Sequence, residues 1–213
     1  MAIDPDRIDV AVAIMTRAPT PGATKTRLIP RLGADGAADL HRHLIRHALQ
    51  VVAEARLGPV TLWCAPDAAD PFLADIASVF DVATRAQPVG DLGARIRAAF
   101  ADDCPLLLMG TDAPVIDAPL LRACAEGLHD HDAVFLPAED GGYALVGLRR
   151  PAPELFESMV WSVDTVMAET RRRLRARGLT FSEPAVVWDI DRPADVDRLI
   201  ASGLLPDWRP SLA

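Results

Sequence analysis

Short apolar runs alternate along the chain with longer segments in which apolar residues recur every three or four positions. The runs are continuous, a pattern typical of strands that are covered on both faces of a sheet. The recurring positions predict amphipathic helices between the strands. We therefore expect a single-domain, three-layer α/β/α fold with a mixed, mainly parallel sheet. The predicted strands span Val10–Met15, Val60–Cys64, Leu106–Met109, Ala133–Leu136, Tyr143–Leu148 and Ala185–Trp188.

Three helices are expected from apolar positions at helical spacing. Too few residues separate the strand ending at Leu136 from the one beginning at Tyr143 for a helical crossover, so this pair should be antiparallel. A further helix is expected to begin after Ser162 as its N-cap, and a last one at Pro193. The three stripes are Leu40, Leu44, Ala48, Val51 and Ala55; Leu92, Ile96 and Phe100; and Leu120, Leu121, Cys124 and Leu128.

The chain has 213 residues, half of them hydrophobic, which suffices for one large core. We expect one domain over residues 1–213, its core at about 8–202 and a loosely packed tail over 203–213. The formal net charge is −8 and the pI is near 5.0. No general basic field is present to hold a polyanion, which argues against a nucleic-acid partner.

Cysteine usage and apolar runs indicate the compartment. Cys64, Cys104 and Cys124 are odd in number and form no CxxC pair, which disfavours disulfides or structural zinc and fits a reducing cytoplasm. The first residues do not resemble a signal peptide, and no apolar run is long enough to span a bilayer. We expect a cytoplasmic protein without a membrane partner. The sequence leaves its oligomeric state open.

Lys25 is the only lysine among 22 Lys and Arg residues. A position that remains Lys in an arginine-rich chain is one where a compact, movable ammonium is needed. It lies, as an exposed loop side chain, between a predicted strand and a predicted helix, in a loop that also holds Gly22, Arg17 and Arg27. Such a loop can present backbone N–H groups and cations to phosphates. We expect a phosphate-binding loop here; the alternative is a basic surface loop in which the lysine survived by chance.

Acidic residues follow two other predicted strands. Asp112, in Gly110-Thr111-Asp112-Ala113-Pro114, can ligate Mg²⁺ or cap a helix, but Asp117 offers a better helix start, which favours the metal role. Asp191 could complete a two-carboxylate metal site with Asp112, or cap the helix at Pro193. On a strand, Asp189 would share its face. Whether Asp189 joins the metal site is left open.

The Asp140-Gly141-Gly142-Tyr143 segment is expected to form a tight turn at which a ligand can approach the backbone closely. Arg95 lies off its helix's apolar stripe and is free either to reach a ligand or to be solvated. His43 and His47 have the spacing of a zinc pair, but no acidic residue supports it. The arginines between Arg171 and Arg177 are interpreted as a solvated helix face.

Five motifs in order along the chain resemble the nucleotide-diphospho-sugar transferase (GT-A fold) superfamily, in particular bacterial glycosyltransferase-like relatives of 2-phospho-L-lactate guanylyltransferase. They are Arg17-Ala18-Pro19 through Lys25-Thr26-Arg27-Leu28; Gly90-Asp91-Leu92-Gly93; Gly110-Thr111-Asp112-Ala113-Pro114; Pro137 through Tyr143; and Trp161-Ser162 with Asp189-Ile190-Asp191. The resemblance implies that the first loop binds nucleotide phosphates, that Asp112 and Asp191 hold Mg²⁺ or Mn²⁺, and that the Asp140–Tyr143 turn faces the acceptor.

This resemblance fixes the fold more firmly than the reaction. Sugar-transferring members carry an Asp-x-Asp pair where this chain has the single acid of Gly110-Thr111-Asp112, as nucleotidyl-transferring members do. We expect an enzyme that transfers a nucleotidyl group from an NTP to a small phosphorylated or carboxylate acceptor and releases pyrophosphate. The alternatives are a glycosyltransferase that uses an NDP-sugar and a catalytically silent nucleotide-binding protein. The candidate nucleotide-binding residues are Arg17, Ala18, Pro19, Gly22, Lys25, Arg27, Arg95 and Thr111, with Lys25 and Asp112 as catalytic residues.

Overall fold

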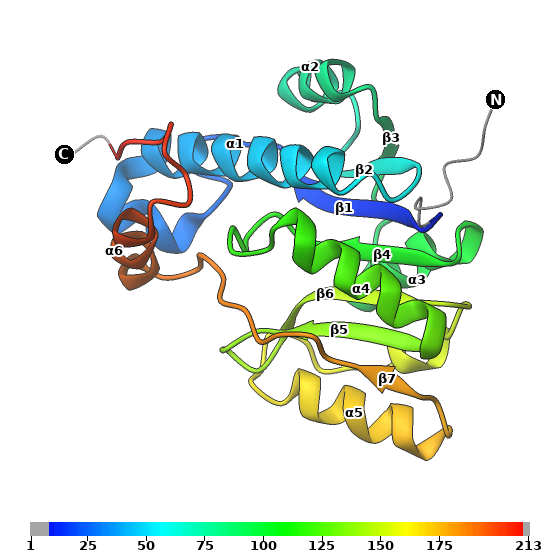
Figure 1. Cartoon of the computed structure of the whole chain (residues 1–213). Coiled ribbons are helices and arrows are strands. Elements are labelled where there is room, and N and C mark those ends of the chain that lie inside the picture. The colour runs from blue at the N-terminus through cyan, green and yellow to red at the C-terminus, as the bar shows by residue number, and fades with distance from the viewer. Residues whose placement is uncertain (1–8, 211–213) are drawn as a thin grey trace.

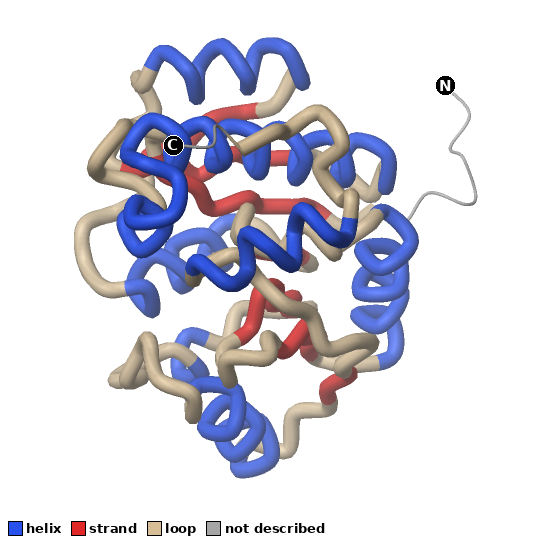
Figure 2. The backbone as a smooth tube through the Cα atoms, turned by 90° about the vertical axis from the view of Figure 1, so that its left-hand side faces the viewer, coloured by secondary structure: helices blue, strands red, loops and turns tan. Residues whose placement is uncertain are grey.

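The computed structural model describes residues 9–210 and shows one mixed sheet with helices on both faces (Figures 1 and 2). The strands are β1 (Ala11–Arg17), β2 (Val60–Ala65), β3 (Ala83–Ala86), β4 (Leu106–Met109), β5 (Ala133–Pro137), β6 (Tyr143–Leu148) and β7 (Phe181–Ser182). The helices are α1 (Ile29–Ala55), α2 (Pro71–Phe80), α3 (Leu92–Asp102), α4 (Ala118–Asp130), α5 (Val166–Ala176) and α6 (Pro193–Ser202), with 3-10 turns at Thr26–Leu28 and Pro153–Leu155.

The strand order in the sheet is β3-β2-β1-β4-β6-β5-β7. Every pairing is parallel except the two made by β6, which runs antiparallel to β4 and to β5. The short turn between β5 and β6 therefore makes an antiparallel pair, as the sequence predicts. The chain leaves β1 toward β2 on one side and later returns to β4 on the other, so the order reverses between β1 and β4. Such a reversal opens a crevice at the carboxyl ends of the strands, where ligands bind in open α/β sheets.

Alternate residues of the buried strands point to opposite faces of the sheet. Val12 and Ile14 of β1 pack with α1, α2 and α4, whereas Ala13 packs with α3 and α5 on the other face. The predicted apolar stripes lie in these layers: Leu121, Cys124 and Leu128 of α4 are buried on the first face, and Ile96 and Phe100 of α3 on the second. This confirms the predicted fold class.

A third apolar cluster joins the first half of α1 to α6 and to the chain after it. Leu40 and Leu44 of α1 pack there with Leu205 and Trp208, which are 9% and 4% exposed. The expectation of a loosely packed tail is therefore wrong for the part up to residue 210, because these two side chains complete the cluster. Residues 211–213 lie outside the described residues, as do residues 1–8, on which the signal-peptide expectation falls.

Two predicted elements differ from the structure. Ala185–Trp188 is not a strand: only Val187 pairs, through an isolated parallel bridge to Ala138. After this bridge the segment leaves the sheet and crosses the ends of the strands, so its other apolar residues do not pair with a neighbouring strand. Ser162 is not a helix N-cap either. It has a left-handed φ of 63°, and α5 begins later, at Val166.

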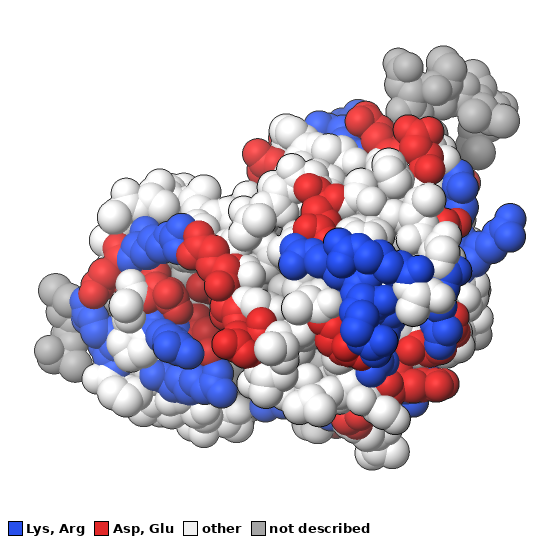
Figure 3. All heavy atoms as spheres, turned by 90° about the horizontal axis from the view of Figure 1, so that it is seen from below, with Lys and Arg blue, Asp and Glu red and all other residues white. Residues whose placement is uncertain are grey.

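The arginines of α5 lie on a mixed surface. Glu169 accepts bonds from both Arg172 and Arg173, and Glu183 accepts a two-pronged bond from Arg171. Figure 3 shows acidic and basic side chains interleaved on the face of the molecule that carries α5. Arg172, Arg175 and Arg177 are exposed, as predicted, whereas Arg171 and Arg173 are half-buried and ion-paired. Within residues 9–210 no helix has the length and apolar character needed to cross a membrane.

Candidate active site

The site lies at the carboxyl ends of β1 and β4, where the strand order reverses. The loop after β1 carries Lys25, and Gly110-Thr111-Asp112 follows β4 directly. The segment that crosses the strand ends is fixed to both, because Ile190 donates its backbone N–H to the Asp112 carbonyl and accepts a bond from the Lys25 ammonium. Two adjoining pockets open here and share Asp112 in their walls.

The first pocket, which we call the basic pocket, has a volume of about 420 Å³. Four cations line it, against two carboxylates. The cations are Arg17, Lys25, Arg27 and Arg95, and the carboxylates are Asp112 and Asp191. Thr111, His41 and Gln87 also line it. The charge balance favours an anionic ligand with several negative charges.

Lys25 differs from the exposed loop lysine that the sequence predicts. Its side chain is only 7% exposed, and its ammonium lies 2.9 Å from the Asp112 carboxylate. Its backbone is left-handed, with φ of 47°, a strained conformation for a residue other than glycine. Such strain is found where the surrounding structure fixes a functional group, and here it directs Lys25 into the crevice.

Asp112 is the carboxylate on which the site is centred. It does not cap a helix, because α4 begins at Ala118 with Asp117 as its N-cap, so the structure excludes that alternative. Burial acts to raise the pKa of Asp112, but the Lys25 ammonium and the Thr111 hydroxyl hold it below its usual value. The carboxylate is therefore ionised at neutral pH, and about half of its side chain, 48%, is open to the crevice.

His41 was not singled out by the sequence. It lies on the buried face of α1, 4% exposed, and its Nε2 is 3.1 Å from the Arg17 carbonyl. Burial lowers its pKa despite the Asp112 charge, so the imidazole is neutral at pH 7. A histidine at an apolar helix position was the only signal in the sequence. Of the other two histidines of α1, His43 contacts Asp39, and His47 lies 3.0 Å from the Pro114 carbonyl.

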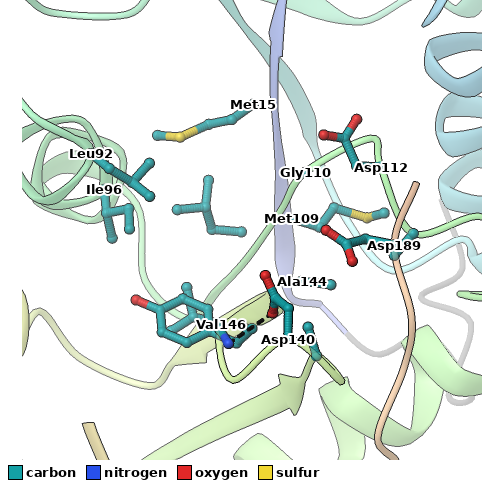
Figure 4. A pocket seen from close by; sticks show the side chains of 15 residues that line it. Met15, Leu92, Ile96, Met109, Gly110, Asp112, Asp140, Ala144, Val146 and Asp189 are labelled. Carbon is teal, nitrogen blue, oxygen red and sulfur yellow. Dashed lines mark hydrogen bonds between the residues drawn. The ribbon is translucent and has the colours of Figure 1, made fainter. Parts of the chain in front are cut away.

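The second pocket, which we call the acidic pocket, has a volume of about 340 Å³. Figure 4 shows Met15, Leu92 and Ile96 on one side of it and Asp112 and Asp189 on the other, with Asp140 below them. The pocket therefore has an apolar wall and an acidic wall.

Asp189 and Asp191 do not face one pocket, as a shared strand face would require. Asp189 lines the acidic pocket, whereas Asp191 lines the basic pocket and is paired with Arg27. Burial, with repulsion from Asp140 and Asp112, raises the pKa of Asp189 to about 6. The expectation of a common face is wrong, because these residues are not in a strand.

The Asp140–Tyr143 turn forms the lower edge of the acidic pocket. The Asp140 carboxylate accepts the Gly142 N–H at 2.9 Å, which fixes the turn. Gly141 does not line the pocket: it has φ of 91°, and a Cβ there would lie 2.0 Å from the Asp164 carbonyl oxygen. The Tyr143 hydroxyl is buried without a hydrogen-bond partner among the described residues, and burial raises its pKa.

Arg95 is fixed by a contact rather than solvated. Its guanidinium donates to Gln87 Oε1 at 3.1 Å, and Gln87 in turn donates to the Thr16 and Trp63 carbonyls. Gln87 thus connects α3 to the ends of β1 and β2. Sequence reasoning missed Gln87 and Met15, which have no charge pattern to mark them.

Three predicted loop residues shape the basic pocket without lining it. The Ala18 N–H bonds to the Ala65 carbonyl, the Pro19 carbonyl accepts a bond from Arg42, and Gly22 has φ of 79°. In each case the residue acts through the loop backbone. The remaining predicted residues of both sites line one of the two pockets, except Gly141.

The carboxylates fit Mg²⁺ or Mn²⁺ in one particular manner. Among residues 9–210 no three His, Cys, Asp or Glu side chains are grouped as an all-protein metal site requires. Mg²⁺, however, is commonly bound through one or two carboxylates together with substrate phosphates and water. Asp112 is ionised and half open to the crevice, and Asp191 lines the same pocket. These are the two carboxylates that an ion arriving with phosphates would meet in the basic pocket.

Comparison of the fold with solved structures gives the class of protein. A protein of Desulfovibrio desulfuricans G20, described as a candidate nucleotide-diphospho-sugar transferase, is 29% identical with a TM-score of 0.82, over 92% of this chain and 88% of that chain. The 4-diphosphocytidyl-2C-methyl-D-erythritol synthase of Anaerococcus prevotii DSM 20548 is 13% identical with a TM-score of 0.61, over 91% and 96%. The chain therefore has the nucleotide-diphospho-sugar transferase fold that its motifs predict.

A third structure with this fold was solved with a nucleoside diphosphate and a glucosyl compound. Glucosyl-3-phosphoglycerate synthase of Mycobacterium tuberculosis, solved with Mn²⁺, UDP and glucosyl-3-phosphoglycerate, is 9% identical with a TM-score of 0.55, over 92% of this chain and 77% of that chain. No curated protein matches the sequence. The sequence profile of a family described as uncharacterized protein conserved in bacteria (DUF2064) matches residues 48–163, and the chain belongs to this family.

Proposed function

We propose that this protein is a metal-dependent transferase that moves a nucleotidyl group from an NTP to a small acceptor and releases pyrophosphate. The main support for this proposal is the basic pocket, in which four cations line a cavity of about 420 Å³ at the point where the strand order reverses. A triphosphate carries more negative charge than the diphosphate of a sugar donor, and so gains more from four cations.

The residues would divide the task as follows. Lys25, Arg17, Arg27 and Arg95 bind and orient the phosphates. Asp112 and Asp191 would hold the divalent ion, which neutralises developing charge on the phosphate oxygens. An acceptor oxygen forms a bond to the α-phosphorus, the bond from that phosphorus to the bridging oxygen breaks, and pyrophosphate leaves. Catalysis rests on positioning and charge neutralisation, without a covalent enzyme intermediate.

The Lys25–Asp112 contact supports this division of roles. Both groups lie 2.9 Å apart, so each neutralises the other before ligands bind. An NTP bound with a divalent ion would supply a phosphate to the ammonium and a cation to the carboxylate, and would therefore replace both partners at once. The left-handed backbone at Lys25 keeps the ammonium within reach of the same space.

Calorimetric titration with an NTP, the matching NDP and an NDP-sugar, each with Mg²⁺, tests the proposal. We expect the NTP to bind about tenfold more tightly than the NDP, because a further charge-assisted contact contributes on the order of 1.5–3 kcal/mol. Arg95→Gln should reduce this preference, whereas Arg46→Gln, an exposed change on α1, should not. An affinity order of NDP-sugar over NDP over NTP would refute nucleotidyl transfer and favour glycosyl transfer. Equal weak binding of all three would exclude a nucleotide site.

A further inference from the structure

The two pockets differ sharply in charge. The basic pocket has four cations, whereas the acidic pocket is lined by Asp112, Asp140 and Asp189 and by no Lys, Arg or His residue. Of its three carboxylates, only Asp112 has an ion-pair partner in the described structure, Lys25. An anion that entered this pocket would meet two uncompensated carboxylates and no cation.

The wall opposite the carboxylates is apolar. Met15, Leu92 and Ile96 face Asp112 and Asp189 across the cavity (Figure 4). The apolar lining is completed by Leu108 and Met109 of β4 and by Val146 of β6. Removing an apolar surface from water against this wall is favourable at about 25 cal/mol per Å², so a bound molecule gains by turning a hydrocarbon face toward it.

We propose that the acidic pocket binds the acceptor, and that the acceptor is a non-anionic alcohol: a hydroxyl compound with an apolar face that is either uncharged or cationic. This inference rests on the proposed function, whose nucleotide occupies the neighbouring basic pocket. It replaces the phosphorylated or carboxylate acceptor expected from the sequence. The acceptor hydroxyl oxygen bonds to the α-phosphorus, pyrophosphate leaves with the bridging oxygen, and the hydroxyl proton passes to water.

A divalent ion at Asp112 does not reverse this charge preference. The ion would arrive with the nucleotide phosphates, which bring at least as much negative charge as the ion neutralises. Asp140 and Asp189 remain, and neither has an ion-pair partner within the described residues. A hydroxyl group, in contrast, can donate a hydrogen bond to a carboxylate, and an ammonium group can pair with it.

Three probes with the same ring test the charge preference: trans-2-aminocyclohexanol, trans-cyclohexane-1,2-diol and 2-hydroxycyclohexanecarboxylate. Their binding to the full chain is measured by ligand-observed NMR at pH 8 without nucleotide. We expect the amine to bind about tenfold or more tightly than the carboxylate, with the diol between them, from the interaction of one unit charge with two carboxylates. A carboxylate probe that binds as tightly as the amine would overturn the inference.

Variants locate the binding. Ala144→Leu fills the pocket from β6 and should remove binding of all three probes, whereas Ala201→Leu on the exposed face of α6 should leave it unchanged. Asp189→Asn and Asp140→Asn keep the size of the side chain and an oxygen acceptor, and each should reduce the amine-to-carboxylate preference severalfold. If Ala144→Leu unfolds the chain, the two Asn variants still decide the matter.

Failure of this inference is distinct from failure of the proposed function. Nucleotide binding is titrated on the same samples, so loss of the NTP preference refutes the proposed reaction without changing the probe result. Conversely, NTP binding with no probe binding, or with probe binding that Ala144→Leu and both Asn variants leave unchanged, refutes the acceptor inference alone.

Discussion

Replacing Lys25 with Ala should produce three effects of different sign. The change removes a side chain that is 7% exposed and that contacts both the Asp112 carboxylate and the Ile190 carbonyl. Nucleotide affinity should fall, thermal stability should fall, and affinity for a divalent ion in the absence of nucleotide should rise. Replacing a lysine in a solvated loop would change neither the thermal stability nor the affinity for a divalent ion. Observing both changes would therefore support the buried ion pair.

The magnitudes follow from the contacts. Removing one partner of a buried charge-assisted contact costs up to a few kcal/mol, but Asp112 is 48% exposed and can recover part of its hydration, so we expect about 1–2 kcal/mol. For a chain of this size that corresponds to about 2–8 °C in melting temperature. Loss of a charge-assisted phosphate contact should weaken nucleotide binding about tenfold or more. Removal of the competing ammonium should strengthen Mn²⁺ binding about tenfold.

Scanning calorimetry and titration with Mn²⁺, with and without nucleotide, measure all three effects on one set of samples. Lys25→Met keeps the apolar stem and separates the charge from the packing, and Arg46→Ala on the exposed face of α1 is the control for loss of a cation. Lys25→Arg should retain only part of the nucleotide affinity, because a planar guanidinium differs in shape and reach from the ammonium. Unchanged Mn²⁺ affinity in Lys25→Ala would refute the idea that the ammonium and the metal share Asp112.

Three further expectations concern other parts of the molecule. Asp112→Asn should abolish metal-dependent transfer, measured as pyrophosphate release, and retained activity would remove Asp112 from the metal site. Gly141→Ala should lower the free energy of unfolding by more than about 2 kcal/mol, because its Cβ would lie 2.0 Å from the Asp164 carbonyl oxygen, whereas Gly22→Ala, also at positive φ but in open space, should cost about 1 kcal/mol. Burial lowers the pKa of His47 below 6.5 in the folded chain, so the unfolded chain binds more protons at acidic pH. The free energy of unfolding should therefore fall as the pH drops below about 6.5. His47→Gln should make the free energy of unfolding, measured by denaturant titration, depend less on pH.

The fold was predictable because its strands are buried on both faces and its helices have clear apolar stripes. Leu106–Met109 and Tyr143–Leu148 agree with β4 and β6 to the residue. Edge elements were harder to find: β3 has exposed residues throughout its four positions, and β7 has only two residues, so neither has an apolar run. Ala185–Trp188 shows the opposite failure, since a run of apolar residues can also cover strand ends without pairing.

The sequence was sufficient to identify the charged residues of the site, but not the residues that each of them contacts. Strand ends with Asp112 and a loop with Lys25 could be found because ligands in parallel sheets gather at one edge. Which residues touch could not be inferred, because the Lys25–Asp112 contact spans 87 positions and depends on how the loop folds back. Asp189 and Asp191 were assigned to one face for a similar reason: two-residue spacing decides orientation only in a strand, and this segment is held by Ile190 instead.

Charge separation between the two pockets gives a physical reason for the position of Asp112. A transfer reaction brings an anionic donor and an acceptor into contact. A single negatively charged cavity would repel the donor, and a single positively charged cavity would not distinguish the donor from an anionic acceptor. Here the cations line the basic pocket and Asp140 and Asp189 line the acidic pocket, with Asp112 in the walls of both. Its bond to Lys25 keeps that shared carboxylate neutralised until a ligand supplies replacements for both charges. If the proposed reaction holds, a non-anionic acceptor is the class of molecule that we expect to approach the α-phosphorus through the acidic pocket.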